Sequence, residues 1–174
     1  ALEARGEISP LSREEALLAR AAEGQASPGD YIDPEALPPA YRGLLRELAH
    51  RPERLEQIRA LVALGVPYDR PDGPDRIPPI QIAGWNGTPE VMGYLLGLRP
   101  DLSHVNAHGG TLLSTIIHGS EHAPDRAERD HISCLRLVLE HGVALPRSAI
   151  RTAGRADIAA FLADWAEAKP GQVV

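Results

Sequence analysis

Cysteine, aromatic residues and lysine are scarce in this chain. Cys134 is the only cysteine among 174 residues, so no intramolecular disulfide can form. Because disulfides are rare in the reducing cytoplasm, we expect a cytoplasmic protein, with a periplasmic or secreted location also compatible with the sequence. Aromatic residues make up only 4% of the chain, so the core has to be built from Leu, Ile, Val and Ala. A core rich in Leu and Ala favours helices.

Long apolar runs and clusters of positive charge are also missing. No apolar stretch approaches the roughly 20 residues of a membrane helix, and residues 1–7 are too polar for a secretory signal. The formal net charge is -6, and Lys169 is the only lysine. Nucleic-acid binding depends on clustered Lys and Arg, so we expect neither a nucleic acid nor a membrane as partner. The chain begins with Ala1 instead of a methionine. We expect that a tag or a leader was removed before this residue.

The composition predicts one globular domain. Hydrophobic residues make up 43% of the chain and charged residues 24%, as in ordinary globular proteins. A chain of 174 residues can bury a sizeable core without disulfides or metals to hold it. Nothing in the sequence calls for a second core.

The sequence repeats itself at a spacing of 33 residues. Residues 78–84 align with residues 111–117, which places Ile80 opposite Leu113. Small or aliphatic residues therefore recur at the inner positions of a short first helix. A repeat of this length indicates stacked helical units, each of which needs its neighbours to bury its apolar face.

A second helix follows each short first helix. Apolar residues at i, i+3, i+4 and i+7 predict second helices at 55–65, 90–96 and 134–142. Gly65 and Gly142 end two of them, because glycine accepts the positive φ of a helix C-terminus.

Further helices flank this region. We predict one at 41–50, which Pro52 separates from the next helix, and a shortened pair at 147–152 and 156–166. Gly154 separates the members of that pair.

The two ends of the chain are predicted to differ from its middle. Ser12 to Glu15 reads as a capping box that opens a helix, which stops at Gly24. This helix and an irregular connector make residues 1–40 a cap, residues 41–166 form the repeat domain, and residues 167–174 form a flexible tail.

Residues 79–96 resemble the ankyrin repeat. They read Pro79-Ile80-Gln81-Ile82-Ala83-Gly84-Trp85-Asn86-Gly87-Thr88-Pro89-Glu90-Val91-Met92-Gly93-Tyr94-Leu95-Leu96. The family pattern runs Thr-Pro-Leu-His, two alanines, a glycine, then Glu-Val-Val and two leucines. The resemblance extends over about residues 41–166. It implies an all-α ankyrin-repeat solenoid of about four to five stacked helix pairs, with atypical terminal capping repeats.

Several positions depart from the family pattern. Pro78 and Gln81 replace the usual threonine and histidine. In the family, an extended loop called the finger leads into the first helix of the next repeat. We therefore expect a weaker hydrogen-bond network between the finger turn and this helix. Arg99-Pro100 stands where the resemblance implies a Gly-Ala pair. Residues 120–130 form an insertion, which we expect to be a polar loop on the side opposite the fingers.

Five histidines fall within residues 104–131. His118 and His122 are four residues apart, a spacing that can present two imidazoles to a metal from one helical face. Gly119-Ser120 is expected to interrupt that helix, so we expect exposed loop histidines, no metal and no cofactor. The alternative is a metal-binding or hydrolytic protein that uses residues 118–131.

Nucleophilic catalysis has little support in the sequence. The Gly-x-Ser-x-Gly signature of hydrolases is absent. Cys134 lies on the apolar stripe of its helix, which predicts a buried structural thiol rather than a nucleophile. We therefore expect no enzymatic activity and no small-molecule substrate.

The resemblance implies a concave surface made of fingers at residues 70–76 and 104–108 together with the first helices. We expect this surface to bind a protein partner. Trp85 has two interpretations: an aromatic anchor for the partner, or packing against the neighbouring repeat. An adaptor, an inhibitor or immunity factor that blocks a toxin, and an effector delivered to a host all fit such a module. The predicted partner-binding residues are Arg70, Asp72, Arg76, Gln81, Trp85, Asn86, His104, Asn106, His108, Ser114 and His118.

Overall fold

The computed structural model describes residues 10–27, 29–71 and 73–174. Over these residues the chain forms ten α-helices and no named strand, which confirms the predicted all-α class. None of the described helices has the length and apolar character needed to cross a membrane. The helices are α1 (Arg13–Ala22), α2 (Pro39–Arg42), α3 (Leu44–Leu48), α4 (Leu55–Leu64), α5 (Pro79–Trp85), α6 (Pro89–Gly97), α7 (Leu112–His122), α8 (His131–Glu140), α9 (Arg147–Thr152) and α10 (Ala156–Ala168).

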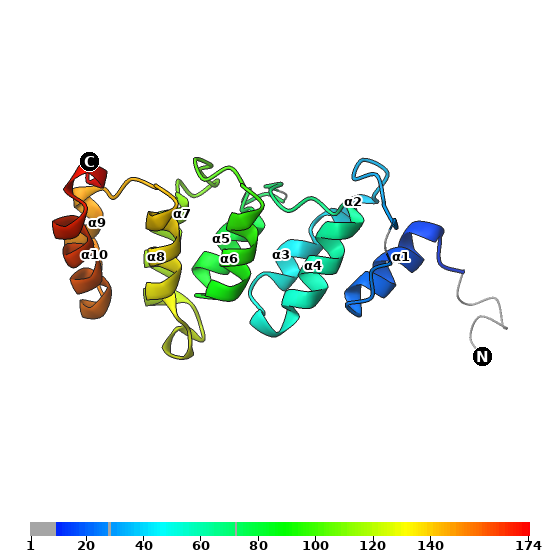
Figure 1. Cartoon of the computed structure of the whole chain (residues 1–174), viewed down its shortest axis with the longest axis horizontal. Coiled ribbons are helices and arrows are strands. Elements are labelled where there is room, and N and C mark those ends of the chain that lie inside the picture. Colours follow the sequence, from blue (N-terminus) through cyan, green and yellow to red (C-terminus); the bar gives the residue numbers. More distant parts are fainter. Residues whose placement is uncertain (1–9, 28, 72) are drawn as a thin grey trace.

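The helices stand in pairs along the long axis of the molecule (Figure 1). Helix α3 packs on α4, α5 on α6, α7 on α8 and α9 on α10, while α1 packs on α4 at the N-terminal end. Neighbouring pairs meet through α5 and α7 on one side and through α6 and α8 on the other. Each pair in the middle of the row therefore buries an apolar face against the next.

Local sequence signals set several helix ends as predicted. The Ser12 hydroxyl accepts a hydrogen bond from Glu15 N at 3.1 Å, and Ser12 N donates to the Glu15 carboxylate at 2.8 Å. This reciprocal pair opens α1. Gly65 ends α4 at φ 104°, and Gly142 follows α8 at φ 84°. The positive φ of both residues is the glycine C-cap that the sequence indicates.

One predicted helix comes out differently, and Arg99 has an unusual backbone conformation. The helix expected at 41–50 is divided into α2 and α3, because Gly43 adopts ψ 3° and leaves the helical range between them. Arg99 occupies the left-handed region at φ 61°, where a glycine would be relaxed. Tyr68 Oη donates to Leu98 O at 2.9 Å and helps to hold this turn.

The C-terminal segment at 167–174, predicted as a flexible tail, makes hydrogen bonds to the rest of the structure. The Gln172 amide donates to Leu139 O and to Val143 O, each at 2.7 Å, and Trp165 Nε1 donates to Gln172 Oε1 at 3.2 Å. Leu139 lies in the last turn of α8 and Val143 just beyond it, 33 and 29 residues before Gln172, and no local sequence pattern announces these contacts.

Helices α5 and α7 approach each other at two glycines. A Cβ on Gly84 would lie 2.7 Å from Ile116 Cγ1. A Cβ on Gly119 would lie 2.1 Å from Trp85 O, which is a backbone atom and cannot rotate away. This is the close helix packing that the small residue at 84 predicts, and Gly119 is its counterpart on α7.

Helix α8 joins the same contact through His131, which is 1% exposed. Its Nε2 donates to Trp85 O at 3.0 Å, since a carbonyl oxygen can only accept. Its Nδ1 is buried and has no hydrogen-bond partner among the described residues. Burial holds the pKa of His131 below its ordinary value of 6.5, while the bond to Trp85 O acts in the opposite direction.

We expect Gly119→Ala to lower the free energy of unfolding by about 1–3 kcal/mol or more, because its methyl group would collide with the Trp85 carbonyl. Gly93→Ala is the matched control, since a Cβ there lies at an ordinary 3.9 Å from Leu137 Cδ1. That control should gain about 0.5–1 kcal/mol from helix propensity. Urea unfolding followed by circular dichroism measures both, and equal effects would contradict the close helix contact.

Acid should destabilise the protein through His131. Because the folded-state pKa of His131 is below that of the unfolded chain, the unfolded state binds the proton more tightly. The stability that the neutral ring contributes is therefore present above about pH 6.5 and is lost as the pH falls through the folded-state value. We expect His131→Gln, which can still donate to Trp85 O, to show a smaller loss of unfolding free energy between about pH 7.5 and about pH 5.5. Gly93→Ala, which changes no titratable group, should keep the wild-type slope.

Candidate functional site

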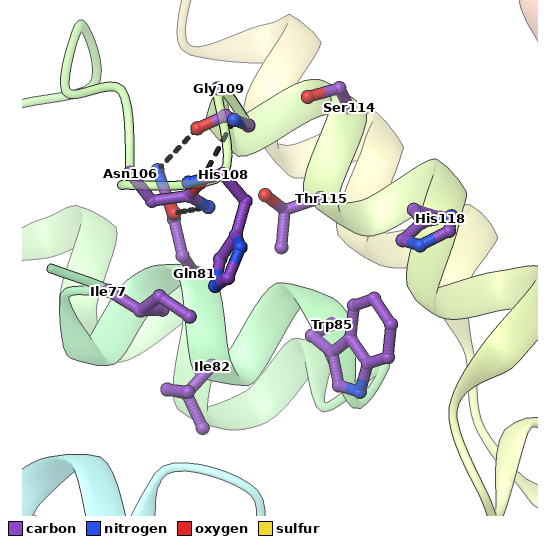
Figure 2. Close-up of a pocket in the computed structure, with 11 residues that line it drawn as sticks. Ile77, Gln81, Ile82, Trp85, Asn106, His108, Gly109, Ser114, Thr115 and His118 are labelled. Atoms are coloured by element: carbon purple, nitrogen blue, oxygen red, sulfur yellow. Dashed lines mark hydrogen bonds between the residues drawn. The ribbon is translucent and has the colours of Figure 1, made fainter. Parts of the chain in front are cut away.

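A groove of about 730 Å³ lies between α5, α7 and the loop at residues 104–110 (Figure 2). We call it the finger groove. Its lining residues come from three separate parts of the chain, so its shape depends on how those parts pack. The lining residues are Ile77, Gln81, Ile82, Trp85, Asn106, His108, Gly109, Gly110, Ser114, Thr115 and His118.

One end of the finger groove is built on a buried amide pair. Asn106 Nδ2 donates to Gln81 Oε1 at 2.9 Å, and Gln81 Nε2 donates to His104 O at 3.1 Å. Asn106 Oδ1 accepts from His108 N at 3.0 Å and from Gly110 N at 2.9 Å. The two side chains thus tie the loop to α5 and close its turn (Figure 2).

This network corrects two predictions about Gln81 and Asn106. Both were expected on a partner-binding surface, but Gln81 is 1% exposed and Asn106 is 9% exposed, so they shape the loop and offer little surface to a partner. Gln81 nevertheless ties the loop to the helix. A glutamine amide has both a donor and an acceptor, and here it uses both.

The apolar part of the groove lies on α5 and just before it. Ile82 and Trp85 are three residues apart and therefore share a helix face. Ile77 precedes the helix and lines the same wall (Figure 2). Trp85 is half-buried, and its ring meets the His118 ring of α7 edge to face, with centroids 5.2 Å apart. Trp85 therefore packs on α7 and also lines the groove, and its role as an anchor for a partner stays a prediction.

The rim of the groove is polar. His108 Nε2 lies 3.0 Å from Asp75 Oδ1, and both side chains are about half exposed or more. Ser114 is exposed, but its hydroxyl is occupied in a capping box with Thr111 at the start of α7. His118 is exposed and lies at the far end of the groove from this cap (Figure 2).

The remaining predicted residues that the structure describes lie outside the groove lining. Arg70 pairs with Glu35 at 3.1 Å. Arg76 O accepts a hydrogen bond from His104 Nε2 at 2.7 Å, which links the two finger loops. The Asn86 amide donates back to its own helix, and Asp72 lies outside the described residues.

Sequence reasoning missed Ile77, Ile82 and Thr115 as lining residues. The spacing of Ile82 to Trp85 was a usable signal for a shared face. Thr115 had no such signal: it follows the predicted Ser114 directly and reaches the groove because of the way α7 is turned against α5.

Helix α7 is continuous through Gly119 and Ser120, so the predicted interruption between His118 and His122 is wrong. Gly119 fits the close contact with α5, and the buried Ser120 hydroxyl donates to Ile117 O at 2.6 Å within the helix. The rings of His118 and His122 consequently stand on one face with centroids 4.3 Å apart.

Cys134 is fully buried on α8, as predicted. Burial raises the pKa of its thiol far above the ordinary range, so the nucleophilic thiolate is strongly disfavoured.

No protein-family model matches the sequence, and a search of curated proteins gives no significant match.

We expect Gln81→Ala to lower the free energy of unfolding by roughly 1–3 kcal/mol, because it leaves the buried Asn106 amide without its acceptor. Gln25→Ala, at an exposed position after α1, is the control and should change stability by less than about 0.5 kcal/mol. Urea unfolding provides the comparison. A neutral Gln81→Ala would show that the loop does not depend on the amide pair.

Proposed function

We propose that the protein is a non-catalytic interaction module of the ankyrin-repeat type, which binds a protein partner in the finger groove. The observation that carries this proposal is a groove formed by the fold itself, with a half-buried tryptophan in its wall. Trp is among the residues that most often dominate binding energy at protein interfaces.

The repeat geometry supports the ankyrin-type assignment. Helix α5 begins at Pro79 and α7 begins at Leu112, which reproduces the 33-residue spacing of the sequence. The aligned residues Ile80 and Leu113 are both buried, at 1% and 3% exposure. Each first helix is followed by a second helix packed on it. Between pairs, α3 contacts α5, α5 contacts α7, and α6 contacts α8.

The form of the groove supports a protein rather than a small molecule. Sites for small molecules surround most of the ligand surface. Here His108, Ser114 and His118 are exposed along the rim. The groove is walled by two helices and one loop of the same row of helices, so one side stays open. A rigid groove of this kind costs little ordering free energy when a protein segment enters it.

Charge narrows the class of partner. The chain carries a formal net charge of -6 and a single lysine. Asp75 stands at the rim of the groove beside His108. Both features favour a basic segment of a partner over an acidic one. An adaptor, an inhibitor or immunity factor, and an effector all remain compatible with such binding, and the buried, reduced Cys134 agrees with a cytoplasmic location.

The non-catalytic part of the proposal rests on where the hydroxyls and the thiol point. Ser114 is engaged in the cap of α7, and the Ser120 hydroxyl is buried against Ile117 O. Neither hydroxyl is bonded to an imidazole, and Cys134 is enclosed in the core. Nucleophilic catalysis requires a nucleophile within hydrogen-bond reach of a base.

We expect Trp85→Ala to weaken partner binding roughly 30-fold or more, the effect of a hot-spot aromatic. Tyr31→Ala is the control, since Tyr31 is 58% exposed and lies outside the groove. The partner is first captured by a photo-crosslinking residue placed at His108 and identified by mass spectrometry, and affinities are then measured with purified proteins. Circular dichroism should show unchanged helicity. Equal losses for both variants, or crosslinking that is equally efficient from position 31, would place the interface elsewhere.

A further inference from the structure

Three side chains with metal-ligating atoms share one face of α7. His118, Glu121 and His122 are spaced at i, i+3 and i+4, which brings them together over one helical turn. One ligand atom from each lies within 4.8 Å of the others. The His122 Nε2 and a Glu121 oxygen are 3.7 Å apart. Both imidazoles are exposed, so an ion from solvent can reach them.

We propose that His118, Glu121 and His122 bind one divalent transition-metal ion, with zinc as the best match. Two imidazoles and one carboxylate form a ligand set that zinc uses in sites with an open fourth position. Calcium and magnesium prefer sites built from oxygen ligands, so the two nitrogens favour zinc over them.

The distances allow the site to close with small movements. Zinc lies about 2.0–2.2 Å from imidazole nitrogens and carboxylate oxygens, so tetrahedral ligands are about 3.3 Å apart. The present separations of up to 4.8 Å exceed this by about an ångström and a half or less. Rotations of exposed side chains on a fixed helix can make up that difference, because the backbone already sets the spacing.

Neighbouring groups orient two of the three ligands. Gly154 N donates to Glu121 Oε1 at 2.6 Å, which holds the carboxylate and leaves its other oxygen facing His122. The Trp85 ring packs against the His118 ring in an edge-to-face arrangement. Metal ligands are commonly held by such outer contacts. Arg155, which donates to Ser120 O on the same turn, is itself paired with Asp157, and this pairing reduces its repulsion of a cation.

The metal site overlaps the finger groove at one residue. His118 lines the groove and also belongs to the metal site, whereas Glu121 and His122 lie outside the groove lining. A bound ion would have its fourth position open to water or to a histidine, carboxylate or thiolate from another molecule.

The test is isothermal titration calorimetry of ZnCl₂ into the full chain without a polyhistidine tag, at about pH 7.5. We expect binding of one ion per chain and at least a tenfold weaker affinity in His118→Ala and in His122→Ala. Glu121→Gln, which can still accept from Gly154 N, should also bind more weakly because an amide is a poorer ligand than a carboxylate.

His141→Ala is the matched control, because His141 is an exposed histidine beyond the C-terminal end of α8. It should keep the wild-type affinity. His118→Ala can disturb the packing of Trp85, and circular dichroism shows whether the fold is retained. His122 lies outside the groove, so His122→Ala tests the metal site without that disturbance. One-to-one zinc binding that survives in the double variant His118→Ala with His122→Ala, or no saturable binding by the wild type, would overturn the proposal. Loss of zinc affinity together with unchanged partner binding in His122→Ala would separate this site from the function of the groove.

Discussion

The backbone contact between α5 and α7 determines how the central part of this molecule is built. Gly119 lies so close to Trp85 O that any side chain at this position would enter the carbonyl group. The same oxygen accepts the hydrogen bond from His131 of α8. One carbonyl at the end of α5 therefore fixes three helices relative to one another. The side chains of Trp85 and His118 face each other because the backbones behind them touch.

The finger groove is held at both of its ends by different physical means. At the Trp85 end, steric closeness between helices sets the geometry, and little adjustment is possible in a close-packed interior. At the loop end, the buried amides of Gln81 and Asn106 hold residues 104–110 through directed hydrogen bonds. Buried amides are costly when unpaired, so this pair also excludes other loop conformations. Ile82 lines the groove between these two ends.

Sequence patterns predicted what depends on neighbouring residues in the chain. The Ser12 capping box, the glycine at the end of α4 and the bounds of α9 could be predicted because their partners lie within a few residues. Three of the failures concern distant partners. Gly119 reads as a helix breaker until Trp85 O is seen beside it. Gln172 reads as tail until the carbonyls of the preceding helix pair are placed next to it. Gln81 reads as a surface amide until Asn106 covers it.

His118 is the one residue shared by the groove and the proposed metal site, and this placement has a thermodynamic consequence. A metal ion that orders the His118 ring also orders the Trp85 ring packed against it. If a protein partner covers Trp85, the affinity for that partner then depends on metal occupancy. By linkage, the partner must change the metal affinity by the same factor. The sign of this coupling depends on what the partner does at the fourth coordination position. A partner that donates a ligand to the ion strengthens both metal binding and partner binding. A partner that needs the His118 ring turned into the groove weakens metal binding.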